Sequence, residues 1–262
     1  IQLMWFINMA VMHGDRVGLV GPGHIDRSLI EFYTRDIENG DLTRAEALAL
    51  IESLYVLYNC FVSRGLAIAV MVGGRDAQGK DVTNELSYLC LEALRRTRLT
   101  YPTVGICWHE GTPEDLSRLA VDLIAEGIPN PAFFGDETIQ QGLARYGMPA
   151  DERCLYLNST CVEITPVGSS NVWVASPYFN LCQMLLEEIR DHVQQGPAAT
   201  FDEFFESYLD RVRREMEVQV ENQNEMRRQR MERGGKPLQS VFTRDCVARG
   251  VDIDRGGARY NW

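Results

Sequence analysis

The chain has 262 residues, of which 45% are hydrophobic and 24% charged, a composition typical of one large globular α/β domain or of two smaller domains. Its net charge of −11 disfavours nucleic-acid binding, because neutralising phosphates requires clustered Lys and Arg. No apolar run approaches the roughly 18 residues that a membrane-spanning helix needs.

Helix start signals are clear at two capping boxes. Thr43 is followed by Glu46, and Thr200 by Glu203, the spacing at which side chain and backbone N–H groups of the first turn satisfy each other. The first pattern predicts a helix that runs to Cys60. The second predicts a helix of about thirty residues that ends before Gly234, with apolar positions too sparse to bury more than a narrow stripe.

Strand and helix patterns alternate through the middle of the chain. Short β-branched or aromatic runs cover 66–74, 103–109, 131–136 and 154–160, and helical patterns cover 84–98, 113–126 and 136–146. The helix at 113–126 should be capped by Thr112 and carry Pro113 at its first position. This alternation predicts a parallel sheet covered by helices, either open or closed into a barrel. Chemistry is then expected on the loops at the carboxyl ends of the strands.

One of these loops resembles a phosphate-binding loop. Gly74, Gly79, Lys80 and Asp81 give the pattern G-x-x-x-x-G-K-D. A phosphate loop needs Ser or Thr after the lysine, so that a hydroxyl can bind magnesium. The acidic residue there disfavours nucleotide hydrolysis and favours a polar turn that leads into a helix capped near Thr83.

The cysteines indicate a reducing compartment. They number seven, which is odd, and no C-x-x-C pair occurs, so neither a disulfide framework nor a structural zinc site is expected. Most should be inert thiols buried in the core of a cytoplasmic protein. They are Cys60, Cys90, Cys107, Cys154, Cys161, Cys182 and Cys246.

The loop after the last predicted strand is the strongest candidate for chemistry. Cys161 and Glu163 are two residues apart, so in an extended stretch both side chains project to the same side. An ionic cysteine mechanism would need a histidine partner. His109, at the end of the strand 103–109, could line the same pocket, or it could be a helix-cap or core histidine. The chemistry of these residues alone favours an inert cysteine beside a surface glutamate.

Four blocks together resemble the glycyl radical enzymes, the pyruvate formate-lyase-like family. The blocks are "DVTNELSYLCLEALRR", "TPEDL", "STCVE" and "GVDIDRGGARYNW", in the family's order. The resemblance implies an α/β fold, an incomplete barrel of parallel half-sheets with outer helices and a cysteine loop that points to the centre. Residues 1–262 would form one partial domain. Its N-terminal part and the C-terminal glycyl radical loop would be absent, so we expect the polypeptide alone to be inactive and poorly stable.

The resemblance also assigns catalytic roles. Cys161 would form the thiyl radical that abstracts a hydrogen atom from a substrate carbon, and Glu163 would act as the base of an elimination. Thr160 stands where pyruvate formate-lyase has a second cysteine, which disfavours acetyl transfer. Trp173 is followed by Val174 and Ala175, where diol dehydratases have His-Asp, so a less polar substrate is expected. His109, Thr160, Trp173 and Ala175 are therefore candidate pocket residues.

The same resemblance implies the partners. The glycyl radical would be stored on a segment outside this chain, with no cofactor or metal bound here. A radical S-adenosylmethionine activating enzyme would generate it, and the full-length enzyme would be a homodimer acting on a small molecule. Three alternatives remain open: an arylacetate decarboxylase of the same family, a non-catalytic barrel homologue, and an ATP-binding α/β protein.

Overall fold

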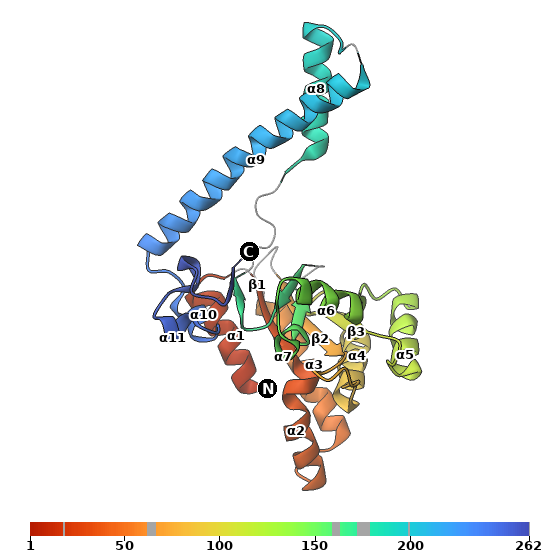
Figure 1. The fold of residues 1–262 in the computed structure, drawn as a ribbon. Coiled ribbons are helices and arrows are strands. Elements are labelled where there is room, and N and C mark those ends of the chain that lie inside the picture. The colour runs from red at the N-terminus through yellow and green to blue at the C-terminus, as the bar shows by residue number, and fades with distance from the viewer. Residues whose placement is uncertain (18, 62–66, 159–162, 172–178, 199, 262) are drawn as a thin grey trace. The chain divides into compact units, whose positions relative to one another are not determined.

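The chain divides into two compact units (Figure 1). The computed structural model describes residues 1–17, 19–61, 67–158, 163–171, 179–198 and 200–261. The larger unit comprises Ile1–Val172 and Lys236–Trp262, and the smaller unit comprises Trp173–Gly235.

A four-stranded parallel sheet forms the centre of the larger unit. Its strands lie in chain order: β1 (Leu19–His24), β2 (Ala67–Gly73), β3 (Thr103–Trp108) and β4 (Ala132–Gly135). The predicted parallel sheet is therefore confirmed. The strand β1 was not predicted, because its sequence, "LVGPGH", contains two glycines and a proline, residues that are depleted in strands.

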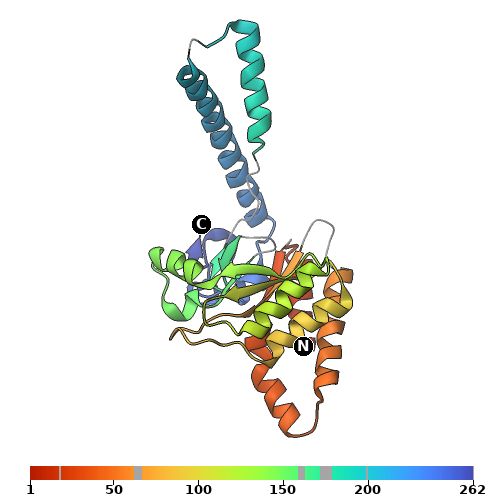
Figure 2. The same cartoon turned by 90° about the vertical axis from the view of Figure 1, so that its right-hand side faces the viewer.

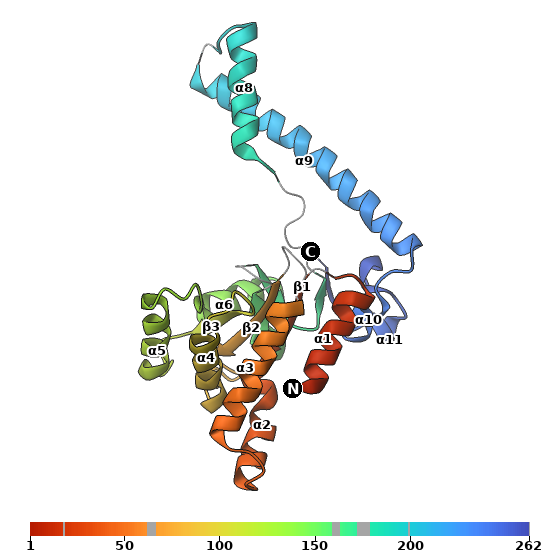
Figure 3. The same cartoon turned by 180° about the vertical axis from the view of Figure 1, so that it is seen from behind.

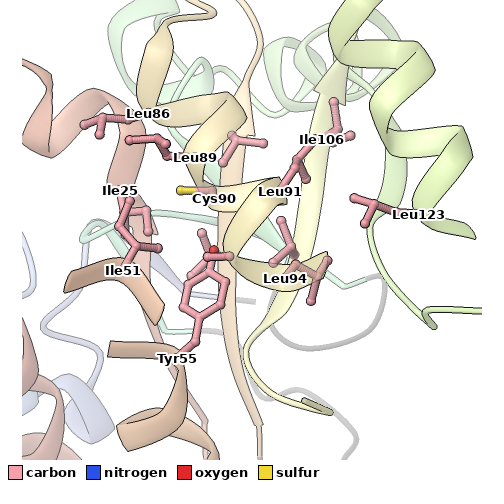
Figure 4. Packing of buried hydrophobic residues seen from close by; sticks show 14 of the residues in the cluster. Ile25, Ile51, Tyr55, Leu86, Leu89, Cys90, Leu91, Leu94, Ile106 and Leu123 are labelled. Carbon is pink, nitrogen blue, oxygen red and sulfur yellow. The ribbon is translucent and has the colours of Figure 1, made fainter. Parts of the chain in front are cut away.

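Helices cover one face of the sheet. Figure 3 shows α3 (Arg44–Phe61) and α4 (Glu85–Thr97) in front of the strands, with α2 (Ile25–Glu38) and α5 (Glu114–Ala125) beside them. Figure 4 shows how their apolar side chains interlock above the strands. This core includes Ile25, Ile51, Tyr55, Val70, Val72, Leu89, Leu94, Val104, Ile106 and Leu123, all buried. The helix α1 (Gln2–Gly14) contributes Met12 to a neighbouring cluster with Leu54 and Tyr58.

The opposite face of the sheet carries shorter elements. They are α6 (Asp136–Arg145), α7 (Ala150–Arg153) and an antiparallel hairpin of β5 (Tyr156–Asn158) and β6 (Ile164–Pro166). Tyr156 and Leu157 of the hairpin pack against Met71, Cys107 and Phe134 of the sheet. Of the run predicted as a strand at 154–160, residues 156–158 form a strand, 154 and 155 form a turn, and 159–160 lie outside the described residues. The strand pairs within a hairpin and does not extend the parallel sheet.

The C-terminal segment returns to the larger unit. It contains α10 (Pro237–Val241), α11 (Cys246–Arg249), the short helix η1 (Ile253–Arg255) and β8 (Tyr260–Asn261). The strand β8 runs parallel to β7 (Ser170–Asn171), so the end of the chain lies beside the segment that follows the hairpin.

The smaller unit is a helical hairpin of α8 (Leu181–Gln195) and α9 (Phe201–Glu232), which lie side by side (Figure 2). Their contact is polar, because Ser207 and Arg211 of α9 both bind the buried Glu188 of α8. The α8 side chains that are largely exposed include Leu181, Ile189 and Val193. No helix in the described part of the chain could cross a bilayer.

The two predicted capping boxes are confirmed. Thr43 and Thr200 form reciprocal bonds with Glu46 and Glu203. The prediction for the helix at 113–126 was wrong: Pro113 occupies the N-cap position of α5 and not its first helical position, and it makes no side-chain cap hydrogen bond. The Thr112 hydroxyl instead accepts a hydrogen bond from the backbone N–H of His109. Of the six cysteines described, all are free and Cys90, Cys107, Cys154 and Cys246 are buried, as expected.

Candidate active site

The carboxyl ends of the four parallel strands place polar residues at one edge of the sheet. His24 ends β1, Gly73 ends β2, His109 follows β3 and Asp136 follows β4. His24, His109 and Asp136 are all buried. Buried polar groups need partners, so the bonds at this edge determine which of these residues remain available for chemistry.

Asp26, in the first turn of α2, joins three elements at this edge. Its fully buried carboxylate accepts hydrogen bonds from the backbone N–H of Gly73 at 2.7 Å and from the Ser87 hydroxyl at 2.6 Å. Burial raises the pKa of Asp26, while these hydrogen bonds and the nearby Arg27 lower it. Asp26 thereby attaches the start of α2 to the end of β2 and to α4.

A buried ion pair spans the ends of β2 and β4. Arg75 Nε donates to Asp136 Oδ2 at 2.9 Å, and the Asp136 side chain is fully buried. Gln140 Nε2 donates to both carboxylate oxygens, at 3.0 and 3.1 Å. The carboxylate is therefore held by two donors, as a buried charge requires.

Gly74 lies next to Asp136 of this ion pair. Its replacement by alanine should destabilise the protein strongly. A Cβ there would lie 2.6 Å from the Cβ of Cys107 and 2.7 Å from Nη2 of Arg27, at a φ of +90°. Overpacking costs about 1–3 kcal/mol, and the left-handed backbone adds about 1 kcal/mol. We expect Gly74→Ala to lower the free energy of unfolding by about 3 kcal/mol, measured as the shift of the urea unfolding midpoint.

Gly79 provides a matched control in the same loop. Its φ is +81°, but a Cβ there would meet nothing within 4 Å. Gly79→Ala should therefore cost only about 1 kcal/mol, the backbone contribution alone. Equal midpoint shifts for the two variants would show that the overlap at Gly74 is relieved at no cost.

The loop that resembles a phosphate site satisfies its own backbone. Asp76 Oδ1 accepts hydrogen bonds from the backbone N–H groups of Gln78 and Lys80, both at 2.9 Å, and the N–H of Gly79 bonds to the Asp76 carbonyl. A phosphate cradle needs such N–H groups turned toward the ligand. The loop is therefore the polar turn that the sequence favours, followed by α4 with Asn84 as its cap.

His109 has bonds at both ring nitrogens. Nδ1 accepts from the backbone N–H of Gly111 at 3.1 Å, so Nε2 carries the proton and donates to Asp81 Oδ1 at 3.1 Å. The same carboxylate oxygen accepts the Thr83 hydroxyl at 2.9 Å. The ring therefore orders the turn after β3, and its nitrogens could meet a substrate only by giving up one of these bonds.

A buried thiol and phenol lie together on the hairpin side of the sheet. Burial raises the pKa of Cys107, and burial and the neighbouring Cys107 and Asp136 raise the pKa of Tyr156. Both groups therefore stay protonated.

The hairpin of β5 and β6 brackets the predicted cysteine loop. Asn158 pairs with Ile164, so the chain from 159 to 163 connects two adjacent strand ends. Glu163 lies directly before β6 and is half-buried. Cys161, Thr160, Trp173 and Ala175 lie outside the described residues, and their predicted roles stay predictions.

The C-terminal block "GGARYNW" is fixed beside this hairpin. Arg259 forms ion pairs with Asp245, at 2.7 Å, and with the buried Glu152 of α7. A Cβ on Gly257 would lie 2.0 Å from the backbone oxygen of Val251, so only glycine fits there. Among the residues with described positions, no group of three His, Cys, Asp or Glu could hold a metal ion.

Sequence reasoning missed the residues that organise this edge, namely His24, Asp26 and Arg27. They follow a strand that was not predicted, so nothing placed them near the cysteine loop. The only local signal was their polarity directly after an apolar run.

Comparison with known proteins extends over the whole chain. The profile of a family described as "Pyruvate formate lyase-like" matches residues 1–262. Trans-4-hydroxy-L-proline dehydratase of Clostridioides difficile is 27% identical over 288 residues, which cover 100% of this chain and 36% of that protein. (2S)-3-sulfopropanediol dehydratase of Klebsiella oxytoca is 28% identical over 294 residues, which cover 100% and 35%.

The fold agrees with solved structures. One that concerns 1,2-propanediol dehydration in Roseburia inulinivorans superposes with a TM-score of 0.91 at 28% identity, over 99% of this chain and 34% of that chain. The expected fold class, α/β with a parallel sheet that forms part of a barrel, is thus confirmed. The chain spans about a third of the length of the relatives it matches.

Proposed function

The chain belongs to the pyruvate formate lyase-like family, whose relatives here are glycyl radical enzymes, and from that premise we propose that it carries the reacting cysteine of an eliminating radical lyase. The reaction would remove water, an amine or a sulfur group from a small hydroxylated substrate. The single observation that carries the proposal is the hairpin that brackets residues 159–163, in a chain related along its whole length to two dehydratases.

The chain's own residues would act in a fixed order. The Cys161 thiol gives a hydrogen atom to the glycyl radical, which a segment outside this chain supplies. The Cys161 sulfur radical then abstracts a hydrogen atom from the substrate carbon that bears the hydroxyl group. The Glu163 carboxylate removes the hydroxyl proton, and the resulting ketyl radical expels the leaving group from the neighbouring carbon. The leaving group takes the proton from Glu163, which restores the carboxylate. The product radical finally takes the hydrogen atom back from the Cys161 thiol, which restores the sulfur radical.

The pocket composition favours a less polar substrate than a simple polyol. Val174 and Ala175 follow Trp173 where diol dehydratases have His-Asp. Without that carboxylate, a substrate hydroxyl loses one charged partner, and a hydrogen bond to a charged group contributes about 1.5–3 kcal/mol. His109, Thr160, Trp173 and Ala175 remain the candidate lining of this pocket.

A substrate screen tests the proposal. The full-length protein that carries this chain should be activated under anoxia by a radical S-adenosylmethionine enzyme and offered hydroxyproline, sulfopropanediol, 1,2-propanediol, glycerol and arylacetates. We expect a carbonyl or imine product from at least one hydroxylated compound. Release of carbon dioxide from an arylacetate alone would favour the decarboxylase instead. A protein that accepts no radical at all would be a non-catalytic homologue. Separately, the mass of the full-length protein in solution would show whether it is a homodimer.

A further inference from the structure

The strand β5 has β6 along one edge only. The Leu155 carbonyl accepts the backbone N–H of Val167 at 3.0 Å, and the Leu157 carbonyl accepts the Thr165 hydroxyl at 3.3 Å. Alternate carbonyls of a strand point to opposite edges. The Tyr156 carbonyl therefore faces away from β6. Cys154 precedes β5, at the end of α7.

Two side chains from the carboxyl end of β1 and the start of α2 bind carbonyls in β5 and in the residues that lead into it. His24 Nε2 lies 2.7 Å from the Tyr156 carbonyl oxygen, and Arg27 Nη1 donates to the Cys154 carbonyl at 3.0 Å. The His24 contact stands where the N–H group of a third strand would otherwise lie. The Arg27 contact holds the end of α7, two residues before β5. We refer to His24 and Arg27 together as the β5 clamp.

The His24 ring is suited to this role. A carbonyl only accepts hydrogen bonds, so Nε2 carries the proton, and Nδ1 has no partner within the described part of the chain. Burial, together with the nearby Arg27, lowers the pKa of His24 to about 3. The ring therefore stays neutral near pH 7, and its one proton stays on the nitrogen that faces β5.

The clamp rests on a rigid base. Arg27 Nη2 also donates to the Gly73 carbonyl at 2.5 Å, so one guanidinium joins the end of β2 to β5. Asp26, between the two clamp residues, binds the N–H of the same glycine and the Ser87 hydroxyl. Through Arg27 and Asp26, the position of β5 is thus fixed relative to the end of the parallel sheet.

We propose that His24 and Arg27 are positioning residues, which fix the strand from which the Cys161–Glu163 loop emerges. The catalytic part of this inference rests on the proposed function. The loop begins at Asn158, two residues after Tyr156, and ends at its strand partner Ile164. A shift of β5 would therefore move the start of the loop relative to the sheet edge.

Amide hydrogen exchange in the full-length protein tests the structural part. In His24→Ala and Arg27→Met, we expect peptides covering residues 154–167 to exchange faster by roughly 5- to 100-fold, because a buried carbonyl loses its donor. His24→Gln keeps an N–H donor and should restore most of the protection. Arg75→Met is the matched control, since Arg75 is also partly buried at this edge but pairs with Asp136 and not with β5. It should leave 154–167 unchanged.

Kinetics test the catalytic part. With the radical content measured separately, His24→Ala should lower kcat by roughly 10- to 100-fold with KM little changed, because a loop displaced by about 1 Å loses its reactive geometry. Unchanged exchange in both clamp variants would overturn the clamp itself. Faster exchange with normal kcat would overturn its catalytic role. A wild-type protein without radical or turnover would refute the proposed function. The exchange result would still show whether His24 and Arg27 hold β5 in place.

Discussion

Replacing Cys161 by serine in the full-length protein should abolish turnover while leaving glycyl radical formation intact. The proposed cycle needs a hydrogen atom to move reversibly between sulfur and carbon. A serine O–H bond is stronger than a thiol S–H bond, so the glycyl radical would not draw a hydrogen atom from it. Product formation, followed by chromatography, should fall to background, and electron paramagnetic resonance should still detect the radical after activation.

Cys182→Ser is the control for this experiment. Cys182 is an exposed thiol at the start of α8, so its replacement should change neither the radical signal nor turnover. If Cys161→Ser retained turnover, the assignment of the reacting sulfur would be wrong. If it lost the radical signal as well, the substitution would have acted on activation and not on hydrogen abstraction.

Replacing Glu163 by glutamine should separate hydrogen abstraction from elimination. An amide of nearly the same shape cannot take the hydroxyl proton, so the ketyl radical would not form efficiently. General-base assistance is worth about 10²–10⁴ in rate, and we expect product formation to fall by that factor. Hydrogen abstraction should continue. It would be detected in a substrate that carries deuterium at the hydroxyl-bearing carbon, because the unconverted substrate recovered after incubation would have lost deuterium.

Glu163→Asp tests the same position with the carboxylate kept. Its shorter side chain should retain part of the activity, because the base is present but displaced by one methylene. Equal product yields from wild type and Glu163→Gln would remove Glu163 from the mechanism. If the substrate recovered from Glu163→Gln kept all its deuterium, hydrogen abstraction would have stopped as well. Glu163 would then support substrate binding or loop structure, and not only proton removal.

Local signals in the sequence predicted most of the elements on the helical side of the sheet. The capping boxes at Thr43 and Thr200 depend on contacts within one turn, so they form wherever that sequence is helical. Residues 68–74 and 104–107 of two predicted strands are buried on both faces of the sheet, and continuous apolar character is typical of such strands. Thr112 shows the limit of this reasoning, because a nearby backbone N–H competed for its hydroxyl.

Contacts between distant segments decided the rest. The sequence by itself determined the α/β class, the parallel core and the family resemblance, because each depends on local periodicity or on contiguous motifs. The tertiary structure alone brought His24 to β5 and Arg27 to the residue that leads into it, each across more than a hundred residues, and paired β5 with β6 in a hairpin. The physical reason is that a buried carbonyl accepts any donor that packing brings within reach, and local sequence does not encode which donor that is.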